Sequence, residues 1–210
     1  MRLQFFWKFR PEGERHELLW PLPPPARTAV LMDGFRPSAG VRTFREEQKS
    51  QLVRYRPDAL AGPVSRLRRL AEGAEDRGSR IPRLTHSVIA FIILKQAFLS
   101  EEARETFWRV FKVPVFGQIL GLSGELLAWE CEAHEGFHIQ PECAAFEARP
   151  GEGDSELLAT SLAPAGKPAF RLPTGLTGRI EESACACGLK GPRLVELRRM
   201  SMARPVEVLR

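Results

Sequence analysis

One stretch of the chain, residues 87–94 (SVIAFIIL), limits the possible folds more than any other. It is a continuous run of mostly β-branched and aromatic residues, so a strand made from it would carry apolar side chains on both faces. Such strands are typical of parallel sheets that are covered on both sides. The run is far shorter than the roughly 20 residues that a membrane-spanning helix needs. It therefore predicts an inner strand of an α/β protein and no membrane-spanning segment.

The residues before this run predict two helices. Residues 44–54 have a helix-like pattern, and Pro57 restricts Arg56 to extended geometry, which ends that helix. Pro63 stands at the start of a second helix, where its missing N–H costs nothing. One face of this second helix carries the apolar side chains of Val64, Leu67, Leu70 and Ala71. A polar loop is predicted over residues 73–82.

A further helix and strand follow the apolar run. Ser100 is the predicted N-cap of a helix over residues 101–112, and glutamates in its first turn suit the helix dipole. The side chains that this helix is expected to bury are Phe107, Val110 and Phe111. Residues 113–120 are predicted to form the next strand. The alternation of helix and strand predicts an α/β layer, with a mostly parallel sheet flanked by helices.

The pattern changes after about residue 137. Short candidate strands, separated by glycine and proline turns, lie at residues 137–139, 144–148, 156–161 and 176–181. They predict a small antiparallel β unit packed on the α/β part. The expected organisation is an N-terminal extension and linker (1–43), an α/β subdomain (44–136), a small β subdomain with a metal site (137–200) and a tail (201–210).

Composition and charge narrow the possible functions. With 43% hydrophobic residues the chain can bury a core, which excludes wholesale disorder. The net charge is +5, but the arginines are scattered at helical spacing without any nucleic-acid-binding motif, so no nucleic-acid partner is expected. Residues 1–15 hold neither a long apolar stretch nor a small-residue cleavage site. We therefore expect a cytoplasmic protein that is not attached to a membrane.

The cysteines and histidines point to a metal site. All four cysteines and two of the four histidines lie between positions 131 and 187. Cytosolic thiols beside histidines are more often metal ligands than disulfides. Zinc takes four thiolate or imidazole ligands in a tetrahedron, and the C-x-C-G turn at residues 185–188 offers two thiolates from one loop. The predicted ligands of a structural zinc ion are Cys131, His138, Cys185 and Cys187.

Two alternatives to this ligand set stay open at the level of sequence. His134 or Cys143 could replace one of the four. The cysteines could also be small buried hydrophobic residues, and the histidines surface residues, with no metal bound. If zinc is bound by four protein ligands, the site has no open position for water, so metal catalysis is not expected.

Three stretches in order resemble one enzyme family. They are YRPDALAGPVSRLRRLAE (55–72), FLSEEARETFWRVFKVPVFGQILGLSGELLAWECEAHEGFHIQPE (98–142) and ELLATSLAPAGKPAFRLPTGLTGRIEESACACGLKGPRL (156–194). This order resembles the phenylacetate–CoA ligase-like branch of the acyl-adenylate-forming, AMP-binding enzymes, over about residues 50–197. Zinc-bearing members of the branch look similar at the four predicted ligands. The resemblance implies part of the large domain of an enzyme that activates a carboxylic acid with ATP.

The family's nucleotide-binding motifs are altered here. The motif YGLSE aligns with residues 120–124, which keep Ser123 but have Leu120 and Gly124 at the tyrosine and glutamate positions. The motif RTGD aligns with residues 173–176, where Leu176 replaces the aspartate that would hold the ribose. By this resemblance, the candidate nucleotide-binding residues are Ser123, Arg171, Thr174 and Gly175.

Other parts of the family's machinery have no counterpart in this sequence. Nothing matches the Ser/Thr/Gly-rich loop that grips the ATP phosphates, and the sequence ends where the small domain with the catalytic lysine would begin. Residues 93–96 replace the glycine-rich segment that lines the adenine pocket. Adenylation needs charge stabilisation aimed at the transition state, and these changes remove much of it. The resemblance therefore implies a truncated homologue without predicted catalytic residues.

Three hypotheses for the function follow. The first is a non-catalytic, truncated homologue that acts as a binding or accessory protein, with a protein partner or a second copy. The second is a divergent or split adenylate-forming ligase that takes ATP and a carboxylic acid, in which Arg171 and Lys95 would be the groups to test. The third is a zinc-stabilised interaction module with no tie to acyl chemistry. ATP or AMP is a cofactor only under the second.

Overall fold

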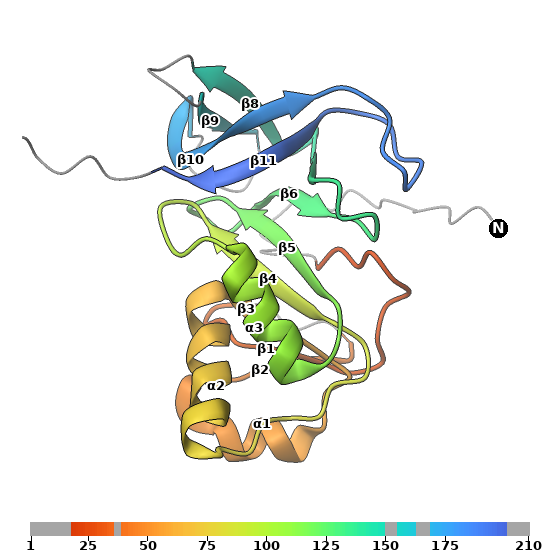
Figure 1. Cartoon of the computed structure of the whole chain (residues 1–210), viewed down its shortest axis with the longest axis vertical. Coiled ribbons are helices and arrows are strands. Elements are labelled where there is room, and N and C mark those ends of the chain that lie inside the picture. Colours follow the sequence, from red (N-terminus) through yellow and green to blue (C-terminus); the bar gives the residue numbers. More distant parts are fainter. Residues whose placement is uncertain (1–17, 36–38, 150–154, 163–168, 201–210) are drawn as a thin grey trace, which may run out of the picture.

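A computed structural model describes residues 18–35, 39–149, 155–162 and 169–200 (Figure 1). Its strands form one sheet in the order β2-β1-β3-β4-β5-β6-β7-β11-β10-β9-β8. The predicted α/β class is confirmed. The tail at residues 201–210 and the first part of the N-terminal extension lie outside the described residues. No helix in the described ranges is long and apolar enough to cross a membrane.

The first five strands of the sheet are parallel. They are β1 (Thr28–Val30), β2 (Val41–Thr43), β3 (Ala59–Pro63), β4 (Val88–Ile93) and β5 (Val115–Leu120). The apolar run that predicted an inner strand forms β4, which pairs in parallel with β3 on one side and β5 on the other. Five of its six residues are buried, because both sheet faces are covered. The prediction of a doubly buried strand is confirmed.

Helices cover only one face of these strands. They are α1 (Lys49–Tyr55), α2 (Val64–Arg77) and α3 (Glu101–Phe111), with a short 3₁₀ turn, η1 (Glu46–Gln48), before the first. They lie together beside the parallel strands in Figure 1. From β2 onward the chain moves steadily toward β5, and right-handed crossovers put all such connections on the same face. The predicted apolar face of α2 is buried against the sheet.

The opposite face is covered by irregular chain. Leu18, Leu19 and Trp20 pack against a cluster of buried residues on that side of the sheet. The Gln118 side chain donates a hydrogen bond to the Leu19 carbonyl at 2.6 Å. The described residues 18–27 of the expected N-terminal extension form no strand, and the first of them lie over this sheet face.

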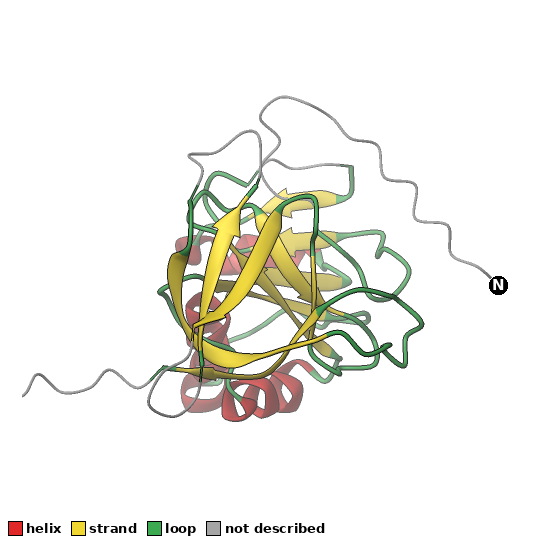
Figure 2. Cartoon of the chain, turned by 90° about the horizontal axis from the view of Figure 1, so that it is seen from above, coloured by secondary structure: helices red, strands yellow, loops and turns green. Residues whose placement is uncertain are grey.

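The remaining strands are antiparallel and continue the same sheet. They are β6 (Leu126–Glu130), β7 (Phe137–Ile139), β8 (Ala144–Arg149), β9 (Glu156–Ser161), β10 (Leu172–Glu181) and β11 (Arg193–Arg199). Figure 2 shows these strands curving around one another. β7 and β9 have the predicted bounds. The division into subdomains stays a prediction, and we note that β1 and β2 lie in the expected extension while β6 precedes the expected second unit.

Two local predictions are corrected. Arg56 is not extended: its φ of 50° and ψ of 59° are left-handed, and its N–H bonds the Val53 carbonyl to end α1. The predicted loop at 73–82 begins late, because α2 continues to Arg77 and stops where Gly78 adopts a φ of 57°. Its polar last turn is supported from outside by an ion pair at 2.7 Å between Glu75 and Arg109 of α3.

Strands β1, β2, β3, β6 and β11 were not expected. β3 (ALAGP) lacks β-branched residues and ends in glycine and proline, so its sequence has no strand pattern. It forms because β1 and β4 supply hydrogen-bonding partners on both sides. Gly62 is required there, since a Cβ atom would lie 2.9 Å from the Leu31 Cβ.

Candidate metal centre

Strand pairing brings the predicted ligands together. Cys131 directly follows β6, and His138 lies in β7 after a tight turn. Cys185 and Cys187 lie in the connection between β10 and β11. β7 pairs with β11 so that His138 is opposite Arg193, which places the two ligand-bearing loops side by side. The turn before β7 needs Gly136, because its φ is 107° and a Cβ atom would lie 2.5 Å from the Leu194 carbonyl oxygen.

The four ligand atoms have the spacing of a tetrahedral site. All lie within 4.8 Å of one another. The Sγ atoms of Cys131 and Cys185 are 3.6 Å apart, and the Cys187 Sγ is 3.4 Å from the His138 Nε2. With zinc–sulfur bonds of about 2.3 Å and zinc–nitrogen bonds of about 2.1 Å, tetrahedral edges are about 3.8 and 3.6 Å. The cluster is consistent with a structural zinc site.

Burial disfavours the charged forms of three of these four groups. Burial raises the pKa of the Cys131 thiol to about 12. It also raises the pKa of the Cys187 thiol and lowers that of the His138 imidazole. Without metal, the Cys131 and Cys187 thiols would therefore be protonated and the His138 imidazole neutral at neutral pH. A bound Zn²⁺ ion would offset the charge of the thiolates, which is why donor type and burial fit a metal.

A buried arginine fastens the two ligand loops to each other. The Arg193 guanidinium donates to the Glu135 carbonyl at 2.6 Å and to the Ser183 hydroxyl at 3.1 Å. The Glu135 carboxylate in turn accepts a bond of 3.0 Å from the Ala186 N–H, between the two cysteines of the C-x-C turn. This bond is the main reason why the pKa of Glu135 is lowered.

Arg193 was not predicted from the sequence. Among many scattered arginines it carries no distinguishing signal, and only its pairing with His138 across the strands shows its place. Its Nε is buried and has no hydrogen-bond partner among the described residues. Glu135 appeared in the sequence only as one of several acidic residues near Cys131.

The two alternative ligands, His134 and Cys143, lie outside the cluster. The exposed imidazole of His134 stacks on the Phe116 ring, with centroids 4.8 Å apart and planes 4° from parallel. Cys143 precedes β8 and is half-buried, and burial raises the pKa of its thiol. The structure thus brings together the four predicted ligands and leaves out both alternatives.

The candidate nucleotide-binding residues are dispersed. Ser123 is exposed on the turn between β5 and β6, whereas Thr174 and Gly175 lie in β10, beyond β6, β7 and β11 in the sheet. The Thr174 hydroxyl donates to the Leu157 carbonyl at 2.7 Å and accepts from the Leu176 N–H at 3.0 Å. Arg171 is paired with Glu147 at 3.2 Å. No hydrogen bond or ion pair in the described ranges joins Ser123 to the others, so their nucleotide role stays a prediction.

One acidic side chain on the Ser123 turn is unusual. The Glu125 carboxylate folds back onto Gly121, where any larger side chain would overlap it. Its Oε2 is buried and has no hydrogen-bond partner among the described residues. This carboxylate stands one place after Gly124, which occupies the glutamate position of the resembled motif.

Comparisons with known proteins show what the fold is similar to. No protein-family model matches the chain, and no curated protein matches its sequence. Among solved structures, 2-hydroxyisobutyryl-CoA ligase in complex with 2-HIB-AMP and CoA is similar, with a TM-score of 0.62 and 16% identity over 84% of this chain. Coronafacic acid ligase from Pectobacterium brasiliense is also similar, with a TM-score of 0.52 and 15% identity over 78% of this chain.

The similarity is partial with respect to the ligases. The chain spans 44% of the first ligase and 39% of the second. At these identities the similarity shows the fold alone. The fold of this chain is therefore similar to somewhat less than half of each of these two ligases, and the chain holds a mostly buried cluster of three cysteines and one histidine that is consistent with a structural zinc site.

Proposed function

We propose that this chain is a non-catalytic partial homologue of adenylate-forming ligases, which acts as a binding or accessory protein and is held together by a structural zinc ion. The observation that carries the zinc assignment is the convergence of Cys131, His138, Cys185 and Cys187 within 4.8 Å. All four coordination positions would be filled by protein atoms, and such closed sites are structural. Zinc would supply a cross-link between the turn before β7 and the connection before β11.

The side chains of β10 support the absence of adenylation. Leu176, at the position of the family's ribose-binding aspartate, is only 5% exposed and packs as an apolar residue. It offers no acceptor for a ribose hydroxyl. The neighbouring Thr174 hydroxyl is already engaged with two backbone groups. A nucleotide would therefore find a packed strand surface where the resembled enzymes have polar ligands.

The zinc proposal is tested by metal analysis of protein purified without chelator. We expect about one zinc per chain by elemental mass spectrometry, and loss of it in the Cys185→Ser/Cys187→Ser double variant. Cys143→Ser is the matched control, because Cys143 is a thiol outside the cluster, and it should retain the metal. Metal-free protein that is fully folded would contradict the zinc assignment.

The catalytic part is tested separately by ATP–pyrophosphate exchange with a panel of carboxylic acids. We expect no exchange above background and no heat of binding with ATP or AMP at millimolar concentration. Exchange caused by a contaminating enzyme would be equal in preparations of the wild type and of a Leu176→Asp variant, so the two are compared. Exchange by the wild-type chain would overturn the non-catalytic assignment.

A divergent or split adenylate-forming ligase is the second candidate. One observation favours it: the buried, unpartnered Oε2 of Glu125 lies on the turn that carries Ser123. A carboxylate oxygen without a donor is a natural position for a cation such as magnesium. Under this alternative the chain would take a carboxylic acid and ATP, and Glu125→Gln would abolish the exchange activity. An exchange rate unchanged by this substitution would contradict the alternative.

The proposed accessory role requires a protein partner or a second copy of the chain. Light scattering of the purified protein distinguishes a monomer from a homo-oligomer. If zinc is present but nucleotide binding and exchange are both absent, the chain could also be a zinc-stabilised interaction module with no tie to acyl chemistry. Association with an acyl-group-bearing protein or enzyme would favour the accessory role over that module.

A further inference from the structure

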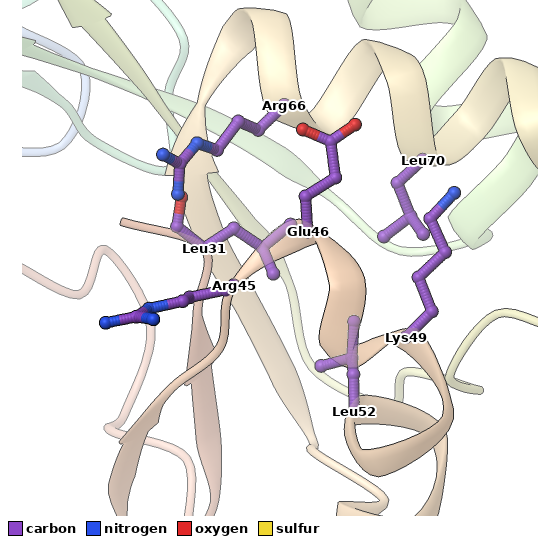
Figure 3. A pocket seen from close by; sticks show the side chains of 7 residues that line it. All are labelled: Leu31, Arg45, Glu46, Lys49, Leu52, Arg66 and Leu70. Carbon is purple, nitrogen blue, oxygen red and sulfur yellow. The ribbon is translucent and has the colours of Figure 1, made fainter. Parts of the chain in front are cut away.

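The pocket that Figure 3 shows in the parallel half is too small for a ligand. Its cavity of about 20 Å³ has room for about one or two water molecules. Its basic side chains do not converge, because the charged ends of Arg45 and Lys49 point away from each other. The cysteine side chains of the antiparallel half offer a different chemistry, since two adjacent thiols can be oxidised to a disulfide bond.

Two thiols of the Cys/His cluster, the set of four predicted metal ligands, are in van der Waals contact. The Sγ atoms of Cys131 and Cys185 lie 3.6 Å apart, although the residues are 54 positions apart in the chain. A disulfide bond is about 2.05 Å long, so the two atoms need to approach by only about 1.5 Å to form one. The third thiol of the cluster, Cys187, lies 3.4 Å from the His138 Nε2. The pair best placed for a disulfide is therefore Cys131 with Cys185.

Contacts that need no metal hold this pair together. Cys131 directly follows β6, and Cys185 lies in the connection between β10 and β11. The buried Arg193, at the start of β11, donates to the Glu135 carbonyl of the β6–β7 connection at 2.6 Å. The Glu135 carboxylate accepts a bond of 3.0 Å from the N–H of Ala186, the residue after Cys185. These hydrogen bonds keep the two connections, and with them the two sulfur atoms, side by side.

The two thiols differ in their exposure. Cys131 is fully buried, whereas Cys185 is 5% exposed. The oxidation of a thiol by peroxide depends on its exposure, and a neighbouring thiol converts the first product into a disulfide. Hydrogen peroxide is only slightly larger than water, so Cys185 is the member of the pair that it reaches. Cys185 therefore has the position of the thiol that is oxidised first, and Cys131 that of the thiol that then reacts with it.

We propose that Cys131 and Cys185 form an oxidation site, at which hydrogen peroxide converts the two thiols into a disulfide bond between the β6–β7 and β10–β11 connections. The Cys185 sulfur attacks one peroxide oxygen and the other oxygen leaves as water, which gives a sulfenic acid on Cys185. The Cys131 sulfur then attacks the Cys185 sulfur, the S–S bond forms and a second water leaves. In sum, the two thiols lose two electrons and two protons, and one hydrogen peroxide is reduced to two water molecules.

The disulfide and the proposed zinc ion use the same two sulfur atoms. This inference rests on the proposed function only in that respect, because the thiol pair is in place with or without an ion. A disulfide would leave His138 and Cys187 as the only ligands of the cluster, so a bound zinc ion would be released as the bond forms. The two connections would stay cross-linked. Peroxide would thus replace a metal cross-link by a covalent one at the same place.

The test is peptide mapping by mass spectrometry of the full chain, as purified, after treatment with excess hydrogen peroxide. We expect a linked pair of peptides that contain Cys131 and Cys185, lighter by two hydrogens than the reduced peptides and separated again by dithiothreitol. A zinc-binding dye in the same sample should show zinc release in step with the disulfide. A map in which Cys185 is joined to Cys187 instead, or in which sulfinic and sulfonic acids form while Cys131 stays unlinked, would overturn the proposal.

Single variants identify the pair. Cys185→Ser should lower the yield of linked Cys131 at least about tenfold, whereas Cys187→Ser should keep most of it, because Cys187 is not a member of the pair. Cys143→Ser is the matched control: it removes a thiol outside the cluster and should leave both the disulfide and the zinc release unchanged. Equally low linkage in Cys185→Ser and Cys187→Ser, with both variants folded by circular dichroism, would contradict the assignment. The wild-type map decides if a variant does not fold.

The same measurements separate this inference from the zinc assignment. Wild-type protein that is purified without zinc, yet forms the disulfide between Cys131 and Cys185, would contradict the zinc assignment and support the oxidation site. Wild-type protein that carries zinc, and in which peroxide leaves these two cysteines unlinked, would overturn the oxidation site and leave the zinc assignment intact.

Discussion

The two halves of the sheet reach stability by different means. In the parallel half, β4 is enclosed between three helices and the irregular residues 18–27 and 31–35, and its apolar side chains fill two buried clusters. In the antiparallel half the strands curve on themselves, and no helix accompanies them among the residues that the structure describes. The apolar core there is an extension of the cluster beneath the helices. The Cys/His cluster lies between the β6–β7 and β10–β11 connections of this half, and a bound zinc ion would cross-link them. The layered half can thus be stabilised by its large buried apolar area, whereas the small curved half would gain more stability from a metal cross-link.

Removing the metal should have the largest effect, and should affect the halves unequally. Structural zinc in small peptides contributes about 10–16 kcal/mol, so chelation is expected to unfold much of the antiparallel half. Hydrogen exchange followed by mass spectrometry should show rapid loss of protection in β7, β10 and β11 and slower loss in β3 and β4. Uniform loss of protection over the whole sheet would show that the halves are a single cooperative unit.

A core truncation in the parallel half should act independently of metal. Phe107 of α3 is fully buried, and Phe107→Ala is expected to cost about 3–5 kcal/mol of unfolding free energy. The adjacent Trp108 is 60% exposed, so Trp108→Ala is the matched control and should have a small effect. Chemical unfolding of both variants, with and without chelator, measures the difference. A cost that vanishes on chelation would contradict independence.

These two regions also differ in how far the sequence predicted them. β4 and α3 follow from local patterns, because an uninterrupted apolar run and a capped amphipathic helix each indicate which side chains are buried. The predicted N-cap of α3 is present: the Ser100 hydroxyl accepts a hydrogen bond from the Ala103 N–H at 3.2 Å. β3 does not, because its strand state depends on neighbours that are distant in sequence. Helix α2 likewise continues past Gly73, where contacts with α3 such as the Glu75–Arg109 ion pair stabilise it.

The candidate metal centre shows the same limit within one site. Its four cysteine and histidine side chains were predicted because few other roles suit those residue types at such density. Arg193 and Glu135 were not, because charged residues are common and only the pairing of β7 with β11 reveals their function. The cover of the helix-free face by residues 18–35 was also missed, since it depends on the handedness of crossovers that no local pattern encodes.

The junction between the halves holds a buried ion pair. Glu130 of β6 accepts from the Arg104 guanidinium of α3 at 2.8 Å and from the Gly117 N–H of β5 at 2.5 Å. Glu130→Gln leaves Arg104 with only the exposed Glu101 carboxylate as a counter-charge, and it sets an amide donor against one of these donors. Because Arg104 is 22% exposed, we expect a cost of about 2–3 kcal/mol, below that of a fully buried pair.

The control for this variant uses the same arginine. Glu101 lies 3.9 Å from Arg104, but its side chain is 86% exposed. Glu101→Gln should therefore change the free energy of unfolding by well under about 1 kcal/mol. Equal effects of the two substitutions in urea unfolding would mean that the junction contributes through general charge and not through the buried pair.

Arg193 should affect the metal more than the fold. It positions the ligand loops without itself being a ligand, and loss of such supporting groups typically lowers metal affinity about 10–100-fold. We expect this decrease for Arg193→Gln in competition with a zinc chelator, with partial rescue in Arg193→Lys. Arg199→Gln, an exposed position of the same strand, is the matched control. Unchanged zinc affinity in Arg193→Gln would restrict Arg193 to a role in β7–β11 packing.

The smallest effect belongs to the ion pair between α2 and α3. The Arg109 guanidinium lowers the pKa of Glu75 by hydrogen bonding and by its charge. A carboxyl whose folded-state pKa is lowered stabilises the fold above its unfolded pKa, and this contribution is lost as pH falls through the folded pKa. Both groups are at the surface, so the change in stability should be slight. The direct measurement is NMR titration of the Glu75 carboxyl carbon: Arg109→Gln should raise its midpoint, and an unmoved midpoint would mean that the pair does not persist in solution, leaving α2 to extend past Gly73 on apolar contacts alone.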